Sequence, residues 1–270
     1  MTVFPPALRL RRAALLGAVC AGLAVAGVTG CGADPDEGTN GVGKLSADQI
    51  ESKARAAAGA ADSVRLSGTL VSSGTSYKLD MRLKADGASG EVTSKDSTFE
   101  LLRLGEELYL KADAAFWSHR EKPGAASDGS GSGSADPAGT DGGEPSADAT
   151  AAAGKLGDKY VKVPEGDAAY KQLRVFTDMK VLLDGVLGLH GKLSKGDYTK
   201  IGATRVIQVD GDEGAGGRLS VSLQGTAYPL RLERAGGAGV VELADWGAPF
   251  TLEAPPAGST VDYGSALPNG

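Results

Sequence analysis

Residues 64–83 have the sequence VRLSGTLVSSGTSYKLDMRL, in which apolar and polar side chains alternate on both sides of a small polar centre. This period of two is typical of a strand with one face in the core and the other in water. The centre, Ser72-Ser73-Gly74-Thr75, predicts a hairpin turn. We therefore expect an antiparallel pair, Val64–Leu70 and Tyr77–Leu83, whose leucines share one buried face.

The same period recurs further along the chain. Strands are expected at 90–94, 99–104, 108–111, 159–163, 198–209, 218–223, 228–232, 240–246 and 250–252. Helical patterns occur at Leu45–Asp62 and Gly166–Gly185. Strands that are segregated from helices in this way predict an α+β fold with an antiparallel sheet. The helices must cover its apolar face, because no other part of the sequence can.

The first predicted helix has a defined start. Ser46 with Gln49 three residues later forms a capping box, and Leu45 and Ile50 are placed to form a hydrophobic staple across it. The alanine-rich continuation to Ala61 predicts a slim helix that can approach its neighbours closely.

The N-terminal residues 1–30 have the pattern of a secretory signal peptide. Arg9, Arg11 and Arg12 precede an uncharged segment that is rich in Ala, Leu, Val and Gly and ends on a small residue. A retained transmembrane helix is the alternative, but it would need about 20 strongly apolar residues. Residues 31–44 are then rich in glycine and polar residues, which predicts a flexible tether.

The tetrapeptide Val28-Thr29-Gly30-Cys31 resembles the lipobox of bacterial lipoproteins. The resemblance implies that a diacylglycerol is attached to the thiol of Cys31 and that cleavage falls just before this residue. It also implies a lipid-anchored location on the extracytoplasmic face of the cell membrane. The Arg11-Arg12 pair leaves twin-arginine export open beside ordinary secretion, although the usual Phe and Lys do not follow it.

Charge and cysteine content exclude several function classes. The chain carries a net charge of −6, and loss of the three N-terminal arginines would bring it to −9. Such an acidic chain is poorly suited to nucleic-acid phosphates, so we predict no nucleic-acid partner. Cys20 falls in the signal segment and the lipid would consume Cys31, which leaves no thiol for a disulfide, a nucleophile or a metal site.

The sequence shows no catalytic constellation. His119 and His190 are far apart in the chain, and each is predicted to be a surface histidine. The run Asp210-Gly-Asp-Glu213 lacks the ligand positions of an EF-hand and is interpreted as an acidic hairpin turn. We predict no enzyme activity, no cofactor and no metal ion.

The mature chain is long enough to bury one core. Residues 123–154 contain no aromatic residue and no aliphatic residue larger than alanine, which predicts a disordered insertion. Strand patterns flank this insertion, so a single domain over residues 45–256 is favoured over a domain boundary. The tail, 257–270, is expected to be loosely held.

Taken together, the mature sequence resembles the LppX and LprG group of actinobacterial lipoproteins, which share a fold with the LolA-type lipoprotein carriers. The similar segments are Cys31, Leu45–Ile50 with Val64–Leu70, Glu107–Lys111 with Phe116-Trp117, and Tyr160–Pro164 with a helix around Leu182-Leu183. The resemblance implies a curved antiparallel half-barrel whose concave face is covered by helices. It also implies a hydrophobic cavity between them for the acyl chains of a lipid or lipoglycan. The insertion at 123–154 departs from this pattern, so the identity of the ligand is not carried over.

The candidate cavity residues are apolar side chains of the predicted sheet and of the second helix. They are Leu66, Leu70, Leu79, Met81, Leu83, Leu108 and Leu110 from the strands, and Phe176, Met179, Leu183 and Leu187 from the helix. Phe116 and Trp117 are candidates for a rim at the cavity mouth. Two alternatives stay open: the cavity candidates meet directly in a filled core, and the two aromatic residues anchor the core at the end of the sheet.

Two functions are compatible with this pattern. The first is a membrane-anchored, non-enzymatic protein that binds or carries an acylated lipid or glycolipid. The alternative is a surface-displayed interaction or sensor module with a filled core, which meets a partner protein through the insertion or the polar strand face. The sequence specifies neither a protein partner nor a particular ligand.

Overall fold

The computed structural model describes residues 34–72, 74–95, 97–114, 116–117, 154–157 and 159–262. The predicted signal peptide, Cys31 and His119 lie outside the described residues, as does the predicted insertion except for Gly154. Residues 35–270 form one compact unit, and the description below concerns this unit alone.

The strands run in two groups along the chain, with helices before and between them. The first group is β1 (Ser63–Ser72), β2 (Thr75–Lys84), β3 (Gly87–Thr93), β4 (Thr98–Leu104), β5 (Glu107–Ala112) and β6 (Tyr160–Val163). The second is β7 (Leu193–Ile201), β8 (Thr204–Gly211), β9 (Arg218–Ser222), β10 (Pro229–Glu233), β11 (Gly239–Ala244) and β12 (Thr260–Asp262). Helices α1 (Ala47–Gly59), α4 (Ala168–Thr177) and α5 (Met179–Val186) are described over their full length, with short 3-10 turns at Val42–Lys44, Asp212–Gly214, Ala235–Gly237 and Ala257–Ser259.

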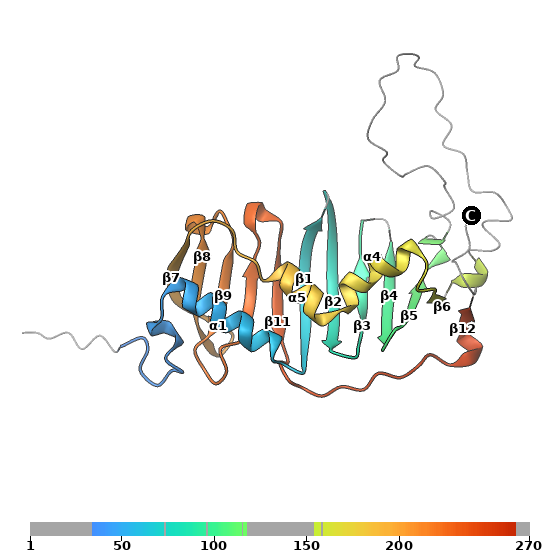
Figure 1. Cartoon of the computed structure of the whole chain (residues 1–270). Coiled ribbons are helices and arrows are strands. Elements are labelled where there is room, and N and C mark those ends of the chain that lie inside the picture. Colours follow the sequence, from blue (N-terminus) through green and yellow to red (C-terminus); the bar gives the residue numbers. More distant parts are fainter. Residues whose placement is uncertain are drawn as a thin grey trace, which may run out of the picture. The chain divides into compact units, whose positions relative to one another are not determined.

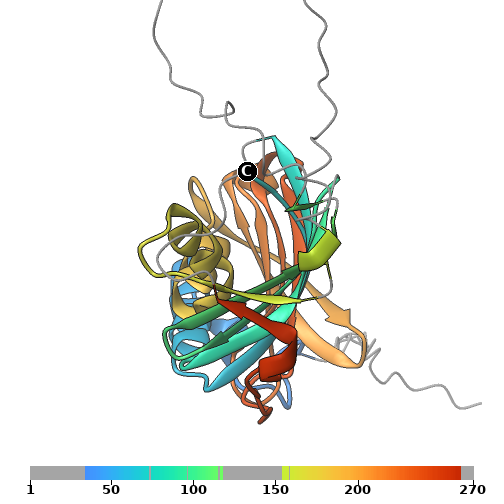
Figure 2. The same cartoon turned by 90° about the vertical axis from the view of Figure 1, so that its right-hand side faces the viewer.

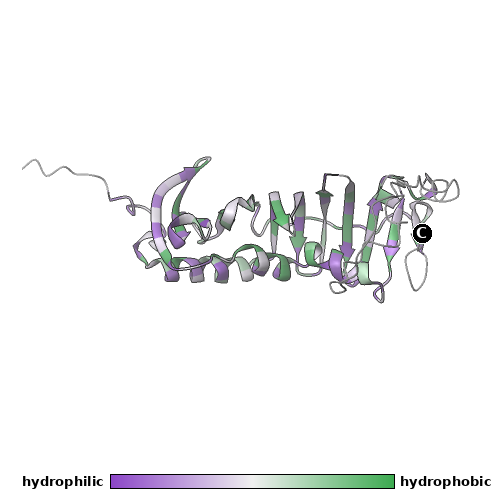
Figure 3. Ribbon diagram, turned by 90° about the horizontal axis from the view of Figure 1, so that it is seen from above, coloured by the Kyte–Doolittle hydropathy of each residue, from purple (hydrophilic) through white to green (hydrophobic). Residues whose placement is uncertain are grey.

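All of these strands belong to one open sheet of twelve strands, in the order β12-β6-β5-β4-β3-β2-β1-β11-β10-β9-β8-β7. Neighbours are antiparallel, except that β12 pairs with β6 in parallel. The helices α1, α5 and α4 lie in a row across one face of the sheet (Figure 1), and a side view shows the sheet curving around them (Figure 2). Figure 3, seen from above, shows the same row along one side of the sheet. The predicted α+β fold, a curved antiparallel sheet covered by helices, is therefore confirmed.

The hairpin predicted within residues 64–83 is present, with Leu66 opposite Met81 and Ser72 opposite Thr75. The two halves of the sheet meet where β1 pairs with β11. Glycine is needed on both strands of this seam: a Cβ atom on Gly68 would lie 2.2 Å from the Val240 carbonyl oxygen, and one on Gly239 would lie 1.9 Å from that of Thr69. Both glycines also have a positive φ, which other residues rarely adopt. The close approach of these backbones joins the two meanders into one sheet.

Helix α1 begins as its sequence predicts. The Gln49 amide nitrogen donates to Ser46 Oγ at 3.3 Å, and the Ser46 amide nitrogen donates to Gln49 Oε1 at 3.1 Å, which completes the capping box. Ile50, Ala54 and Ala58 form the buried face of the helix. The helix ends at Gly59, three residues before the predicted end.

The second predicted helix, Gly166–Gly185, is instead two helices that are separated at Asp178. This residue has φ −91° and ψ 109°, which is outside the helical region, and its carboxylate accepts a hydrogen bond from the Val181 amide nitrogen at 3.1 Å. Asp178 thus ends α4 and caps α5. The apolar residues keep a helical spacing on both sides of Asp178, so the sequence pattern alone does not reveal the break.

Arg103 of β4 ties the break between α4 and α5 to the sheet. Arg103 is only 3% exposed, and its guanidinium donates from Nε and Nη2 to the Thr177 carbonyl oxygen, at 3.2 and 3.0 Å. It also donates to the carbonyl oxygens of Gly105 at 2.8 Å and of Ala85 at 3.4 Å. One buried cation therefore connects the end of α4 to the β2–β3 and β4–β5 turns.

Helix α4 has a second attachment to the β4–β5 turn. The Tyr170 hydroxyl donates to the Glu106 carbonyl oxygen at 2.7 Å, and the Arg174 guanidinium donates to the Glu106 carboxylate. The hydrogen bond from Arg174, together with the positive charge of this residue, lowers the pKa of the Glu106 carboxylate. The pKa of Arg174 is raised in turn, chiefly by the same hydrogen bond.

Residues 34–44 differ from the flexible tether that their composition predicts. Val42 is buried, and the Asn40 side chain donates to the Ser222 and Gly225 carbonyl oxygens at 3.0 and 3.1 Å. The Tyr198 hydroxyl donates to Asp36 Oδ2 at 2.8 Å. The segment packs on β7–β9 because a few side chains in a glycine-rich background find specific partners.

The C-terminal part and one hairpin also differ from the prediction. The expected strand at 250–252 is absent: residues 245–256 have no regular structure and run past the ends of the strands from β11 to β12 (Figure 1). The tail expected to be loose from 257 instead contributes β12, while 263–270 lie outside the described residues. The single strand expected at 198–209 is a hairpin of β7 and β8, because Gly202 turns the chain with φ +57°.

Replacing Arg103 by leucine should lower the free energy of unfolding by about 3 kcal/mol, because three carbonyl oxygens near α4 would lose their donor. Urea unfolding followed by circular dichroism measures this loss. Arg65→Leu is the matched control, since Arg65 also lies on the sheet but pairs with Asp80 in solvent. Equal losses in the two variants would contradict the proposed role of Arg103.

Candidate ligand groove between helices α1 and α5

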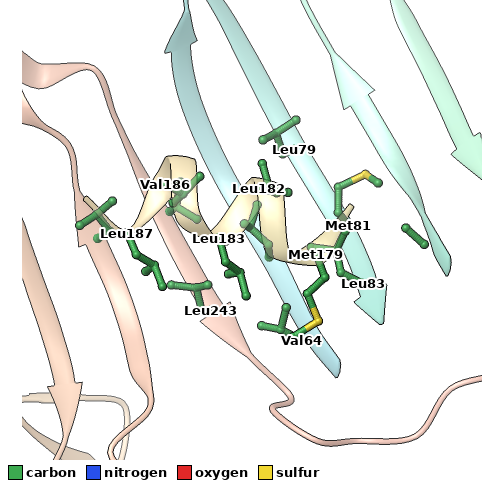
Figure 4. Close-up of a cluster of buried hydrophobic side chains, with 14 of the residues drawn as sticks. Val64, Leu79, Met81, Leu83, Met179, Leu182, Leu183, Val186, Leu187 and Leu243 are labelled. Carbon is green, nitrogen blue, oxygen red and sulfur yellow. The ribbon is translucent and has the colours of Figure 1, made fainter. Parts of the chain in front are cut away.

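The predicted cavity residues of the sheet are packed in a core. Leu66, Leu79, Met81, Leu83, Leu108 and Leu110 are all buried, and Leu70 is half-buried against the same cluster. Figure 4 shows α5 lying over this region, with Met179, Leu182 and Leu183 directed at side chains of β1 and β2. Beneath α5, helix and sheet therefore meet directly.

A groove remains at the side of this packed region, between the C-terminal part of α1 and α5. It has a volume of about 280 Å³. Its lining is Arg55, Ala58, Gly59, Ala61, Ala85, Met179, Lys180, Leu183, Asp184 and Leu187. Of the predicted cavity residues, Met179, Leu183 and Leu187 line it, and Phe176 lies half-buried on the neighbouring helix α4. Ligand pockets generally have volumes of roughly 300–1,000 Å³, so this groove is of the size that takes a small apolar group.

The groove exists because α1 carries very small side chains where it faces α5. Residues 56–61 are Ala-Ala-Ala-Gly-Ala-Ala. The opposite wall is made by the long side chains of Met179, Leu183 and Leu187. Large residues on one helix and only methyl groups on the other leave unfilled apolar space between them.

The rim of the groove is charged, although its walls are apolar. Arg55 Nη2 on α1 lies 3.6 Å from Asp184 Oδ1 on α5, and Arg55 Nη1 lies 3.5 Å from Glu51 Oε1 one turn earlier. Lys180 is exposed on α5 and forms no ion pair with any residue that the structure describes. The groove thus has the polarity of a site for an amphiphile, with an apolar interior and ionic groups at its opening.

Phe116 and Trp117 lie in an aromatic cluster at the end of β4 and β5. The ring of Phe116 is 5.5 Å from that of Phe99 and 5.2 Å from that of Trp117, between ring centroids. Trp117 is buried, and its indole Nε1 donates to the Ala112 carbonyl oxygen at 3.3 Å. Neither residue lines the groove, and this packing corresponds to the alternative in which they anchor the core.

Other hollows occur elsewhere in the described part of the chain. One, of about 350 Å³, is lined by small residues of α1 and of the segment 225–227, beside Asn40, Val42 and Lys53. Another, of about 460 Å³, opens among glycines of the turns before β9 and β11, and it is bordered by Arg218, Glu233 and Arg234. Arg218 is held there by Asp210, with 2.6 Å between Nε and Oδ1. The lining of this hollow combines glycine backbone and charged side chains with Ala215 and Val240, and it lacks the long apolar side chains that α5 supplies to the groove.

Within the described residues, no group of three or more His, Cys, Asp or Glu side chains is placed to hold a metal ion. His190 is exposed, after the end of α5. Among the helices of this same part, none has both the length and the apolar character needed to span a membrane.

Comparison with known proteins finds similarity among solved structures. No family model matches the chain, and no curated protein matches it. A solved chain described as the crystal structure of LprF from Mycobacterium bovis is similar to it, with 17% sequence identity and a TM-score of 0.46. The similarity covers 77% of this chain and 96% of the LprF chain.

The charged rim residues Arg55, Lys180 and Asp184 were not singled out from the sequence. Each looks like an ordinary solvent-facing residue of an amphipathic helix. The run of small residues at 56–61 was the available signal, since it predicts a slim helix. Which helix would lie opposite this run depends on the order of the strands, and the sequence does not state that order.

Leu183 links the groove to the core, and its side chain is only 4% exposed. Leu183→Ala should lower the free energy of unfolding by about 2–5 kcal/mol through lost burial and a new cavity. Val181→Ala is the control on the same helix, because Val181 is 48% exposed and its loss should change the free energy by less than about 0.5 kcal/mol. Urea titration of the two variants tests whether α5 is docked by this face.

Proposed function

We propose that this chain is an extracytoplasmic lipoprotein, anchored to the cell membrane through Cys31, that binds an acyl chain in the groove between α1 and α5. The observation that carries the proposal is the groove itself, with its apolar walls and charged rim. In this mechanism the protein sequesters the chain from water, while the polar head of the ligand stays at the rim. No bond in the ligand is made or broken.

Burial of the acyl chain supplies the driving force. Each methylene group removed from water contributes about 0.8 kcal/mol, so even a few of them in the groove give useful affinity. The wall formed by Met179 and Leu183 suits this role, because methionine side chains adjust easily to the shape of an apolar partner.

The anchor and the groove serve the same membrane. Residues 35–44 are part of the fold, which leaves only residues 32–34 between Cys31 and the compact unit. A diacylglycerol on Cys31 would therefore keep the binding site close to the bilayer that supplies or receives the ligand.

The second candidate function is a surface-displayed interaction or sensor module without a lipid ligand. It is favoured by one observation: the predicted cavity residues of the sheet are packed against the helices, and the groove beside them is small. In that case the apolar residues act only as a core, and the insertion or the polar strand face meets a partner protein.

Lipid co-purification distinguishes the two candidates. The protein from residue 33 to 270, which retains the whole compact unit, should yield an acyl lipid by mass spectrometry of its solvent extract. Ala61→Trp should reduce this lipid by about tenfold, because the indole would fill the groove that Ala61 lines. Ala60→Trp is the matched control, since Ala60 is exposed and does not line the groove. Absence of lipid from the unmodified protein would reject the lipid-binding function.

The anchor has its own test. Replacing Cys31 by serine removes the thiol that accepts the lipid, so the variant should remain unlipidated and leave the membrane fraction. Metabolic labelling with a radioactive fatty acid and fractionation of cells measure both effects. A variant that is processed normally and stays with the membrane would contradict the proposed anchor.

A further inference from the structure

The charged residues at the rim of the groove have no role in packing the core. Arg55 and Asp184 come from different helices, both line the groove, and their side chains approach each other across its opening. The residues between and below them are apolar. A cation and an anion at this place are therefore available to the polar head of an amphiphile that enters the groove.

The ion pair between Arg55 and Asp184 is weak, so another anion can replace Asp184. The N···O distance is 3.6 Å, and the side chains of Arg55 and Asp184 are 37% and 64% exposed. Pairs of this geometry and exposure contribute little to stability, because both partners are almost as well solvated by water. Another anion at Arg55 can take the place of Asp184 at small cost.

Two cations and one anion line the groove, and Glu51 beside Arg55 is a second anion. Arg55 and Lys180 are the cations of the lining, and Asp184 is its anion. Glu51 also contacts Arg55, but it does not line the groove. An anion that displaces Asp184 can bind the planar guanidinium of Arg55 through two of its oxygen atoms. Lys180 lies on the same rim.

We infer that the ligand is a single-chain amphiphile with an anionic head group, a carboxylate or a phosphate, which binds Arg55 and Lys180 in place of Asp184. This inference rests on the proposed function, and it adds the class of ligand. The chain lies against Met179, Leu183 and Leu187, and the volume of about 280 Å³ suits one chain. Asp184 then acts as a tethered competitor that occupies Arg55 when the groove is free.

The test compares three ligands with the same chain: decanoate, decyl phosphate and 1-decanol. Equilibrium dialysis against the protein from residue 33 to 270 at pH 7.5 gives the three dissociation constants. Both anions should bind about tenfold more tightly than 1-decanol, as expected for a charge-assisted hydrogen bond. A preference for one of the two anions identifies the head group as a carboxylate or a phosphate.

Variants assign this preference to the rim. Arg55→Gln should weaken binding of the anions about tenfold, and Asp184→Asn should strengthen it about threefold by removing the competitor. Binding of 1-decanol should change by less than about twofold in both variants. Lys53→Gln and Asp48→Asn are the charge-matched controls, because both residues are exposed on α1 and neither lines the groove. They should leave all three dissociation constants unchanged.

The outcomes separate this inference from the proposed function. Equal binding of all three ligands, with no effect of the Arg55 and Asp184 variants, overturns the anion preference while lipid binding stands. Loss of 1-decanol binding in Arg55→Gln as well would show that the residue acts on groove shape and would also overturn the inference. If none of the ligands binds, both the proposed function and the inference fail.

Discussion

Burial of the apolar concave face of the sheet is the constraint on which the rest of the structure depends. An open sheet of twelve strands presents a long row of leucine, valine and methionine side chains on this face, and each gains roughly 1.5–3 kcal/mol when it is removed from water. Helices α1, α5 and α4 supply the cover by lying across the strands in a row (Figure 1). The seam glycines Gly68 and Gly239 join the two halves of the sheet, so that one row of helices can serve both.

The features around the helices follow from this need for cover. A single straight helix cannot follow a curved sheet over its whole width, and the chain breaks at Asp178, where a carboxylate caps the next helix. Arg103 fixes the break by binding the last carbonyl group of α4. A buried cation that is satisfied by carbonyl oxygens is well suited to this position, because the end of a helix presents carbonyl groups without internal partners.

The candidate groove lies where the helices that cover the sheet carry their smallest side chains. Alanine and glycine at the end of α1 leave an apolar gap beside α5, and its edge is solvent-exposed, so charged residues can lie there. Ala58 belongs both to the buried face of α1 and to the lining of the gap. Packing of the core and formation of a groove are therefore two consequences of one stretch of sequence.

Local patterns in the sequence determined the elements and the class of fold. The alternation in Val64–Leu83 and the capping box at Ser46 act over a few residues, so strands, turns and the helix start could be predicted from them. The structure alone decided the pairing of β1 with β11, the addition of β12, the break at Asp178 and the packing of residues 34–44. It also determined that the predicted cavity residues of the sheet are packed in the core. Met179, Leu183 and Leu187 border a groove, together with Arg55 and Asp184. These features depend on partners far apart in the chain, from 74 residues for Arg103 and Thr177 to 182 residues for Asn40 and Ser222. A pattern of polarity states which side of an element is buried but not what it is buried against.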